Sequence, residues 1–429
     1  MKSWFDTARF GMFVHWGHSS VRGCELSWPL VGGVFSLPLS GNVPVDQYHS
    51  TANIFNPRNY HPDSWAQLAK RLGVQYVILT TKHHDGFAMF HTQQSNFSIQ
   101  HSPYGRDIVR EFIDAMRSHS IRVGLYFSLI DWHHPDYPAF TEADKPYVFG
   151  QWRQPTDQQW QRFIGFMFSQ VRELLTNYGK IDILWFDGAW ERTPEQWQTI
   201  ALHDTIRSLQ PEILINDRLP PFGDFSTPEQ FIPPEPPTHS WETCMTINDS
   251  WGYNCCDRNF KSARQLIHTL CEVAGMGGNL LLNVSPMGDG QIQPELLDRL
   301  AVIESWIARN GESIIGTTPG LKPWQFYGPS SRKGLRFYLH LLMKPYETIS
   351  VRGVPIKRVQ SVSVLADGTE LNYTKRCAIV DALSHPDPIG ELTIQVPESV
   401  IDSNATVIAI DFTQTLADSS ANDNLSDLA

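Results

Sequence analysis

A carboxylate directly follows one of the most apolar runs of the sequence. Residues 181–186 read Ile-Asp-Ile-Leu-Trp-Phe, and Asp187 and Gly188 come next. A short apolar run bounded by turn residues is typical of an inner strand of a parallel sheet. The carboxyl ends of such strands are where α/β proteins keep their active sites. Asp187 is therefore either a catalytic carboxylate or an ordinary capping residue. The residues at the ends of the other predicted strands distinguish the two.

Polar and aromatic side chains follow several other predicted strands in the same way. They form the groups His15-Trp16, Lys82-His83-His84-Asp85, Tyr126-Phe-Ser128, Trp185-Phe-Asp187 and Asn216-Asp217-Arg218. Buried polar groups cost stability unless they find partners. Five strand ends of this kind therefore indicate a binding site at one mouth of the sheet rather than ordinary packing.

A metal site is the first alternative, because His15, His83 and His84 stand at these strand ends and His133 and His134 follow shortly after Ser128. Neighbouring residues of a regular strand point to opposite faces, and the sequence has no His-X-His pair that would place two imidazoles on one side. Sugar hydroxyls suit histidine donors and acceptors equally well. We expect no metal and no cofactor, and a metal-dependent hydrolase stays as an alternative.

A glycosidase would need a second carboxylate beside Asp187. The candidates are Glu229, Glu235 and Glu242. The loop of residues 222–237 is rich in proline and aromatic residues. Desolvation in such a loop would raise the pKa of a glutamate, which suits a general acid.

Composition narrows the class of partner. The chain has 429 residues, a net charge of −11, and 14 Trp, 23 Phe and 13 Tyr. The negative charge argues against nucleic acid and anionic membranes, and the aromatic content is compatible with sugar binding. No run of about 20 apolar residues predicts a membrane span. The N-terminus lacks an apolar signal core, so a cytoplasmic protein and a processed periplasmic or secreted form both remain, as does a homo-oligomer.

Predicted strands and helices alternate through the first 320 residues, which indicates an irregular (β/α)8, TIM-like barrel. The expected strands are 12–16, 76–81, 123–128, 181–186, 213–216, 241–244 and 279–284. The expected helices are 63–72, 107–118, 160–178, 194–209, 261–274 and 294–309.

Short alternating runs follow in residues 321–413 and predict a β-sandwich without helices. The expected strands are 335–342, 348–351, 359–365, 377–380, 392–396 and 406–411. Residues 414–429 are small and polar, and we expect them to be disordered.

Taken together, these residues resemble those of the α-L-fucosidases of glycoside hydrolase family 29. The motifs that carry the resemblance occur in one order along the barrel: Phe10 to Gly17, Lys82 to Phe87, Trp185 to Gly188, Asn216 to Arg218, Trp251 to Tyr253 and Gly278 to Asn283. The family is similar in architecture, with an irregular barrel followed by a β-sandwich.

The resemblance implies a retaining mechanism with Asp187 as the nucleophile. It implies that His15, His83 and His84 hold fucose hydroxyls and that Tyr126, Trp185 and Arg218 complete the sugar pocket. Members similar to this chain carry the acid/base glutamate about 40 residues after the nucleophile, so the resemblance favours Glu229, with Glu242 as its rival. Glu25 and Trp28 stand close to where many members have an adjacent Glu-Trp pair, and they are further binding candidates.

The sequence therefore predicts an exo-acting α-L-fucosidase that acts on fucosylated oligosaccharides or glycoconjugates. A non-catalytic carbohydrate-binding protein remains as a second alternative. The α1,2, α1,3/4 and α1,6 linkages remain as alternatives for the bond that such a fucosidase cleaves.

Overall fold

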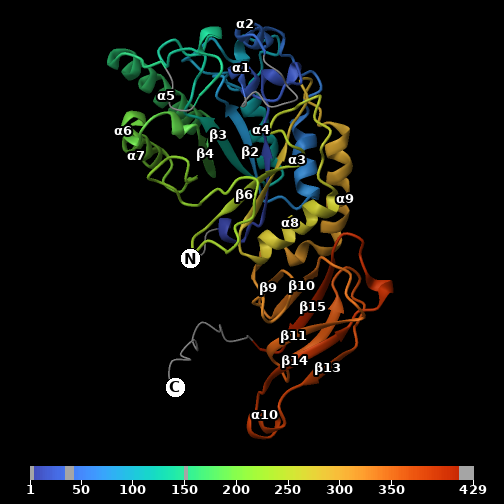
Figure 1. The fold of residues 1–429 in the computed structure, drawn as a ribbon. Coiled ribbons are helices and arrows are strands. Elements are labelled where there is room, and N and C mark those ends of the chain that lie inside the picture. The colour runs from blue at the N-terminus through green and yellow to red at the C-terminus, as the bar shows by residue number, and fades with distance from the viewer. Residues whose placement is uncertain (1–3, 34–42, 149–152, 415–429) are drawn as a thin grey trace.

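The computed structural model describes residues 4–33, 43–148 and 153–414. A parallel sheet surrounded by helices forms the N-terminal part, and antiparallel sheets form the C-terminal part (Figure 1). This is the irregular TIM-like fold with a C-terminal β region that the sequence predicts. The tail predicted to be disordered lies, from residue 415 onward, outside the described residues.

Seven parallel strands form the first sheet, in the order β5-β4-β3-β2-β1-β7-β6. The strands are β1 Phe10–Val14, β2 Tyr76–Lys82, β3 Arg122–Ser128, β4 Ile183–Asp187, β5 Leu214–Ile215, β6 Glu242–Thr246 and β7 Asn279–Val284. All seven residues of β2 are buried, as expected of a parallel strand covered on both faces. The shared strand direction brings all the carboxyl ends to one mouth.

An extended segment, residues 225–229, lies between β5 and β6. Single parallel bridges join Asn216 to Phe225, Ser226 to Trp241, and Glu229 to Cys244. The segment thus stands in for a strand where the sheet is irregular. It also ends with Glu229 at the same mouth as the other strand ends, a placement that its proline-rich sequence does not reveal.

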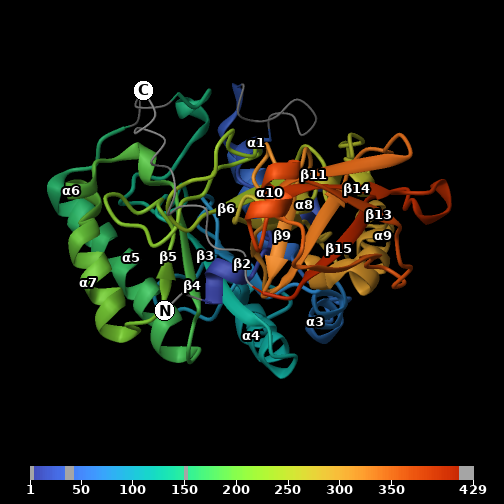
Figure 2. The same cartoon turned by 90° about the horizontal axis from the view of Figure 1, so that it is seen from below.

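The helices pack around this sheet (Figures 1 and 2). They are α1 Trp28–Val31, α2 Val45–His49, α3 Pro62–Arg71, α4 Ile108–Ser118, α5 Asp157–Asn177, α6 Pro194–Trp197, α7 Thr199–Leu209, α8 Ala263–Gly275 and α9 Pro294–Asn310. A capping box at Thr156 begins α5, in line with the preference for Thr at this position. The single helix predicted for 194–209 is wrong in detail, because Gln198 takes a left-handed conformation and separates α6 from α7.

Two antiparallel sheets form the C-terminal part, with orders β12-β15-β10-β9-β8 and β11-β14-β13. The strands are β8 Thr318–Pro319, β9 Ser330–Lys333, β10 Arg336–Leu341, β11 Thr348–Pro355, β12 Val359–Val364, β13 Tyr373–Arg376, β14 Ile389–Gln395 and β15 Thr406–Phe412. Buried side chains from both sheets, among them Val351, Leu392 and Ile410, share one apolar core, as in a β-sandwich.

The strand predicted at 377–380 is wrong. This stretch leads into a short helix, α10 Ile379–Ser384, so the expectation of a region without helices is wrong too. Ile379, Val380 and Leu383 have helical spacing, and all three are exposed. These apolar side chains therefore do not pack into the sandwich core as those of a strand would. The sequence also missed β8, β9 and β13, which are short and polar.

The five-stranded C-terminal sheet packs against α8 and α9 (Figure 1). Trp306 of α9 is fully buried, and its indole N–H donates to the carbonyl of Ala405 at 2.8 Å. His268 of α8 contacts the carbonyl of Asn404 at 2.7 Å. The first antiparallel strand begins at Thr318, and a domain boundary near residue 320 stays our proposal.

We expect Trp306→Ala to lower the free energy of unfolding by about 3–5 kcal/mol, because it removes a large buried side chain and leaves the Ala405 carbonyl without its donor. Urea denaturation measures this. Trp324→Ala is the matched control, since Trp324 is 60% exposed, and we expect a change of about 0.5 kcal/mol or less. Equal losses in the two variants would contradict the role of Trp306 at this junction.

Candidate active site

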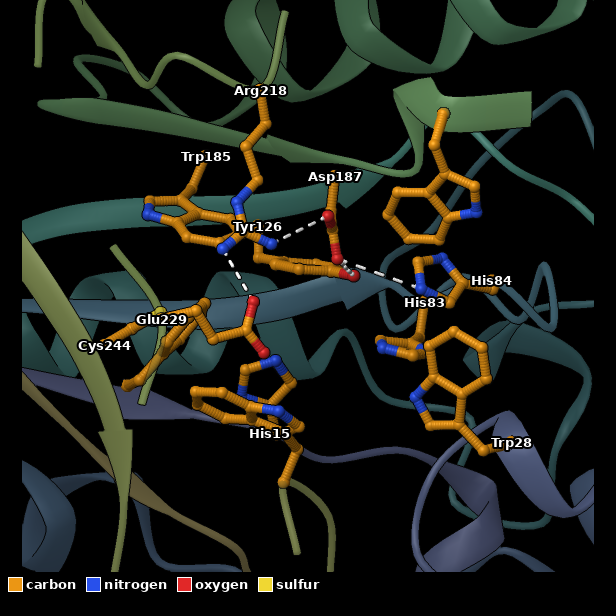
Figure 3. Close-up of a pocket in the computed structure, with 13 residues that line it drawn as sticks. His15, Trp28, His83, His84, Tyr126, Trp185, Asp187, Arg218, Glu229 and Cys244 are labelled. Atoms are coloured by element: carbon orange, nitrogen blue, oxygen red, sulfur yellow. Dashed lines mark hydrogen bonds and ion pairs between the residues drawn. The ribbon is translucent and has the colours of Figure 1, made fainter. Parts of the chain in front are cut away.

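A cavity of about 400 Å³ opens at the carboxyl ends of the parallel strands. It lies where the polar strand ends were predicted to meet (Figure 3). The residues that line it are Phe13, His15, Trp28, His83, His84, Tyr126, Trp185, Asp187, Trp190, Arg218, Glu229, Cys244 and Trp251. Its volume and its mixture of aromatic walls with a few convergent polar groups fit a small-molecule site.

Asp187 is the last residue of β4 and lies at the centre of the cavity (Figure 3). One carboxylate oxygen accepts a hydrogen bond from the Tyr126 hydroxyl at 2.9 Å, and the other lies 3.1 Å from Nη1 of Arg218. Gly188, the next residue, has a φ of 85°, which favours glycine. A Cβ there would also meet Ile130 at 2.9 Å. The chain therefore turns away sharply and leaves the carboxylate facing the cavity.

The Arg218 guanidinium binds a second carboxylate, that of Glu229. Its Nη2 lies 2.7 Å from Oε2 of Glu229, while its Nη1 holds Asp187. The guanidinium also lies over the Trp185 ring at 4.6 Å. Burial is the largest single effect and opposes its charge, but the negative groups around it, Asp187 first and Glu229 among them, together raise the pKa of Arg218. One cation thus joins the two carboxylates that the sequence singled out.

Glu229 differs from the sequence-based expectation in one respect. We predicted a desolvated carboxyl in an apolar loop, but the Glu229 side chain is 40% exposed and paired with a guanidinium. The residues that give the loop its apolar character do not enclose this carboxyl: Phe231 is itself 54% exposed, and Phe225 packs into the barrel interior against Phe5.

His15, His83 and His84 line the cavity and are buried. The strand β2 ends at Lys82, so His83 and His84 follow it and both reach the same cavity. Burial lowers the pKa of His15 to about 4 and that of His84 to about 3, and it lowers the pKa of His83 well below its usual value. All three imidazoles are therefore neutral at pH 7.

Aromatic rings complete the walls. Trp185 stacks on Tyr126 with centroids 5.6 Å apart, and Phe13 meets Trp185 edge-on at 5.1 Å. Phe13, Trp190, Cys244 and Trp251 were not among the predicted site residues. Period-two alternation could have found Phe13, which is two residues before His15 on β1 and so shares its face.

Glu242 and Glu25 do not line the cavity. Glu242 is fully buried at the start of β6, where it accepts hydrogen bonds from the Trp185 indole at 2.8 Å and the Tyr76 hydroxyl at 2.5 Å. Glu25 is also fully buried, and its carboxylate accepts the backbone N–H groups of Leu26, Trp251 and Gly252. Glu242 therefore holds Trp185, and Glu25 holds the backbone of Trp251; both tryptophans line the cavity.

Glu235, the third candidate for the second carboxylate, is exposed and does not line the cavity. Across residues 4–33, 43–148 and 153–414, no three His, Cys, Asp or Glu side chains are grouped to hold a metal ion. In the same ranges no helix is long and apolar enough to cross a membrane.

A curled parallel sheet with two carboxylates in a sugar-sized, aromatic and imidazole-lined cavity is the arrangement of a glycoside hydrolase. The α-L-fucosidase family model matches residues 1–312. The chain therefore belongs to the α-L-fucosidase family, glycoside hydrolase family 29, and is an α-L-fucosidase by homology. Membership removes the non-catalytic binding protein as an alternative.

Similar proteins agree with this. The tissue α-L-fucosidase of Bos taurus is 34% identical over 87% of this chain and 82% of its own length. Among solved structures, α-L-fucosidase isoenzyme 1 from Paenibacillus thiaminolyticus is 36% identical, has a TM-score of 0.83, and matches over 95% of this chain and 98% of its own. A family 29 α-L-fucosidase from Bacteroides thetaiotaomicron, solved as a trapped covalent intermediate, is 26% identical with a TM-score of 0.79 over 95% and 94% of the two chains.

The buried Glu242 generates a prediction about stability and pH. Burial raises the pKa of its carboxyl from 4.5 to about 7, against the opposing hydrogen bonds from Tyr76 and Trp185. Between these two values the folded protein keeps a proton that the unfolded chain releases, so the free energy of unfolding falls as pH rises. At about 1.4 kcal/mol per pH unit, the loss from this residue reaches about 3 kcal/mol by pH 7.

Urea denaturation from pH 5 to 8 measures this fall, and Glu242→Gln should flatten it because the amide does not titrate. Glu235→Gln is the control, since Glu235 is exposed, and it should keep the wild-type slope. A wild-type slope in Glu242→Gln would contradict the elevated pKa of Glu242.

Proposed function

We propose that the protein is a retaining exo-α-L-fucosidase with Asp187 as the nucleophile and Glu229 as the acid/base. The observation that supports this most directly is that both carboxylates contact one guanidinium, Arg218, inside one cavity. A retaining glycosidase needs two carboxyl groups close together on either side of the scissile bond. Glu242, the rival for the acid/base, lies beneath Trp185 and outside the cavity.

In the proposed first step Asp187 attacks the anomeric carbon while Glu229 protonates the glycosidic oxygen. The bond to the leaving group breaks, and a β-linked fucosyl ester forms on Asp187 through an oxocarbenium-like transition state. Tyr126 and Arg218 hold the Asp187 carboxylate in place before the attack. In the second step Glu229 takes a proton from water, which displaces Asp187 and releases fucose with its original anomeric configuration.

The surroundings of the two carboxylates suit these different tasks. Asp187 is 8% exposed and held by two donors, which keeps a nucleophile oriented in a largely water-free place. The Glu229 side chain is 40% exposed, so both the leaving group and the incoming water can reach it. The neutral imidazoles and the aromatic wall then bind the hydroxyls and the apolar C6 methyl of a single terminal fucose, which accounts for exo action.

We expect Asp187→Ala to lower the kcat for an aryl α-L-fucoside by about 10⁴-fold or more. Glu229→Ala should lower the kcat for a fucosylated oligosaccharide, whose leaving group needs a proton, by roughly 10²–10⁴-fold. Azide separates the two roles. It should replace the missing nucleophile in Asp187→Ala and give β-fucosyl azide. In Glu229→Ala it should attack the fucosyl-enzyme and give α-fucosyl azide.

Glu242→Ala is the comparison variant, and it should give no fucosyl azide because its carboxyl touches only the buried Trp185 and Tyr76. An α-fucosyl azide from Glu242→Ala instead of Glu229→Ala would move the acid/base assignment. Assays in excess chelator address the metal-dependent alternative, and full activity there would count against it.

A further inference from the structure

The three cavity imidazoles have partners whose hydrogen-bonding direction is fixed. A neutral imidazole donates from one ring nitrogen and accepts at the other, and the partner of one nitrogen sets the role of the other. Nδ1 of His15 lies 2.8 Å from Oδ1 of Asn283, Nδ1 of His84 lies 2.7 Å from the Ser128 hydroxyl, and Nδ1 of His83 lies 2.6 Å from the Ser27 hydroxyl. In each ring this leaves Nε2 for the cavity.

Asn283 fixes the proton of His15. The Asn283 amide nitrogen donates to the Trp251 carbonyl at 2.7 Å, and a carbonyl can only accept. The amide oxygen must therefore face His15, and because that oxygen has no proton, Nδ1 of His15 must carry one. Nε2 of His15 is then a bare acceptor. Glu25 extends this series of hydrogen bonds, since its carboxylate accepts the backbone N–H of Trp251 at 2.8 Å.

Ser128 fixes the proton of His84 by the same argument. The Ser128 hydroxyl has one proton, which it donates to the Ile130 carbonyl at 3.0 Å. Its oxygen must therefore accept from Nδ1–H of His84, and Nε2 is bare. This Nε2 lies 3.8 Å from Oδ2 of Asp187. Two acceptors face each other there with no proton between them, so a ligand at this position has to supply one.

Ser27 gives His83 the opposite polarity. The buried Ser27 oxygen accepts the backbone N–H of Asp85 at 2.9 Å. Among the residues that the structure describes, the acceptor for the Ser27 proton is Nδ1 of His83. The alternative would leave a buried hydroxyl proton without a partner, which costs stability. Nδ1 of His83 is then bare, and its Nε2–H is a donor.

We propose that Asn283, Ser128 and Ser27 are positioning residues that fix the tautomers, so that His15 and His84 offer acceptors and His83 offers a donor to the ligand. On the function proposed above, two fucose hydroxyls donate to His15 and His84 and one accepts from His83. A sugar that has no hydroxyl at one of these three positions leaves a buried nitrogen unpaired, which is the kind of mismatch that a polar site rejects most strongly. The tautomers also keep Nε2–H of His84 from pairing with Asp187.

Nitrogen NMR of the full-length protein with ¹⁵N-labelled histidine, at pH 7, tests the proposal directly. Each ring shows which nitrogen carries the proton, and spectra of His15→Ala, His83→Ala and His84→Ala assign the three rings. We expect the proton on Nδ1 in His15 and His84 and on Nε2 in His83. The opposite tautomer in any of the three would overturn the proposal for that ring and its positioning residue.

Ser128→Ala and Ser27→Ala form a matched pair. Without the Ser128 oxygen, His84 should move its proton to Nε2, where it faces Asp187, while the signals of His83 stay unchanged. Ser27→Ala should release His83 from its Nε2–H form and leave His84 as it is. Unchanged His84 signals in folded Ser128→Ala would contradict the role of Ser128.

These spectra need no substrate, so they are independent of the proposed reaction. The expected tautomers in a protein that does not cleave an aryl α-L-fucoside would overturn the proposed function alone. Normal cleavage with different tautomers would overturn this inference alone.

Discussion

The contact of one guanidinium with two carboxylates is the interaction on which the rest of the site depends. Two carboxylates close enough to act on one glycosidic bond repel each other, and Arg218 offsets that repulsion by binding both. The cation is itself placed by Trp185, over whose ring it lies. Trp185 is held in turn by the buried Glu242. The position of the proposed catalytic pair therefore depends on a chain of contacts that reaches down into the barrel.

The fold supplies what this arrangement requires. Parallel strands bring Asp187 and the histidines to one mouth, because their carboxyl ends lie on the same side of the sheet. Glu229 arrives by a different route, on the extended segment between β5 and β6. The proposed nucleophile thus belongs to a rigid strand, while the proposed acid/base belongs to an irregular segment nearer to solvent. Each location matches the access that its task needs.

Most of the barrel and much of the site could be predicted from the sequence, because parallel strands are long apolar runs and their polar ends mark a mouth. The remaining features depend on tertiary contacts, which the spacing of apolar residues in the sequence does not indicate. The role of Glu25 could not be read from its position, since only the fold brings the backbone of Trp251 to its carboxylate. Likewise, the exposure of Glu229 depends on where its loop packs, and α10 replaced a predicted strand because its β-branched residues have no core to cover.

In the proposed mechanism Asp187 forms a covalent bond to fucose, and this fucosyl-enzyme can be trapped. A fluorine at C2 of a fucosyl fluoride destabilises the oxocarbenium-like transition state and slows both steps, while the good leaving group keeps the first step accessible. Mass spectrometry of the treated protein and its peptides then locates the sugar. We expect one added 2-fluorofucosyl group, on Asp187, and none in Asp187→Ala. A label on another residue, or an active enzyme that never accumulates a label, would contradict it.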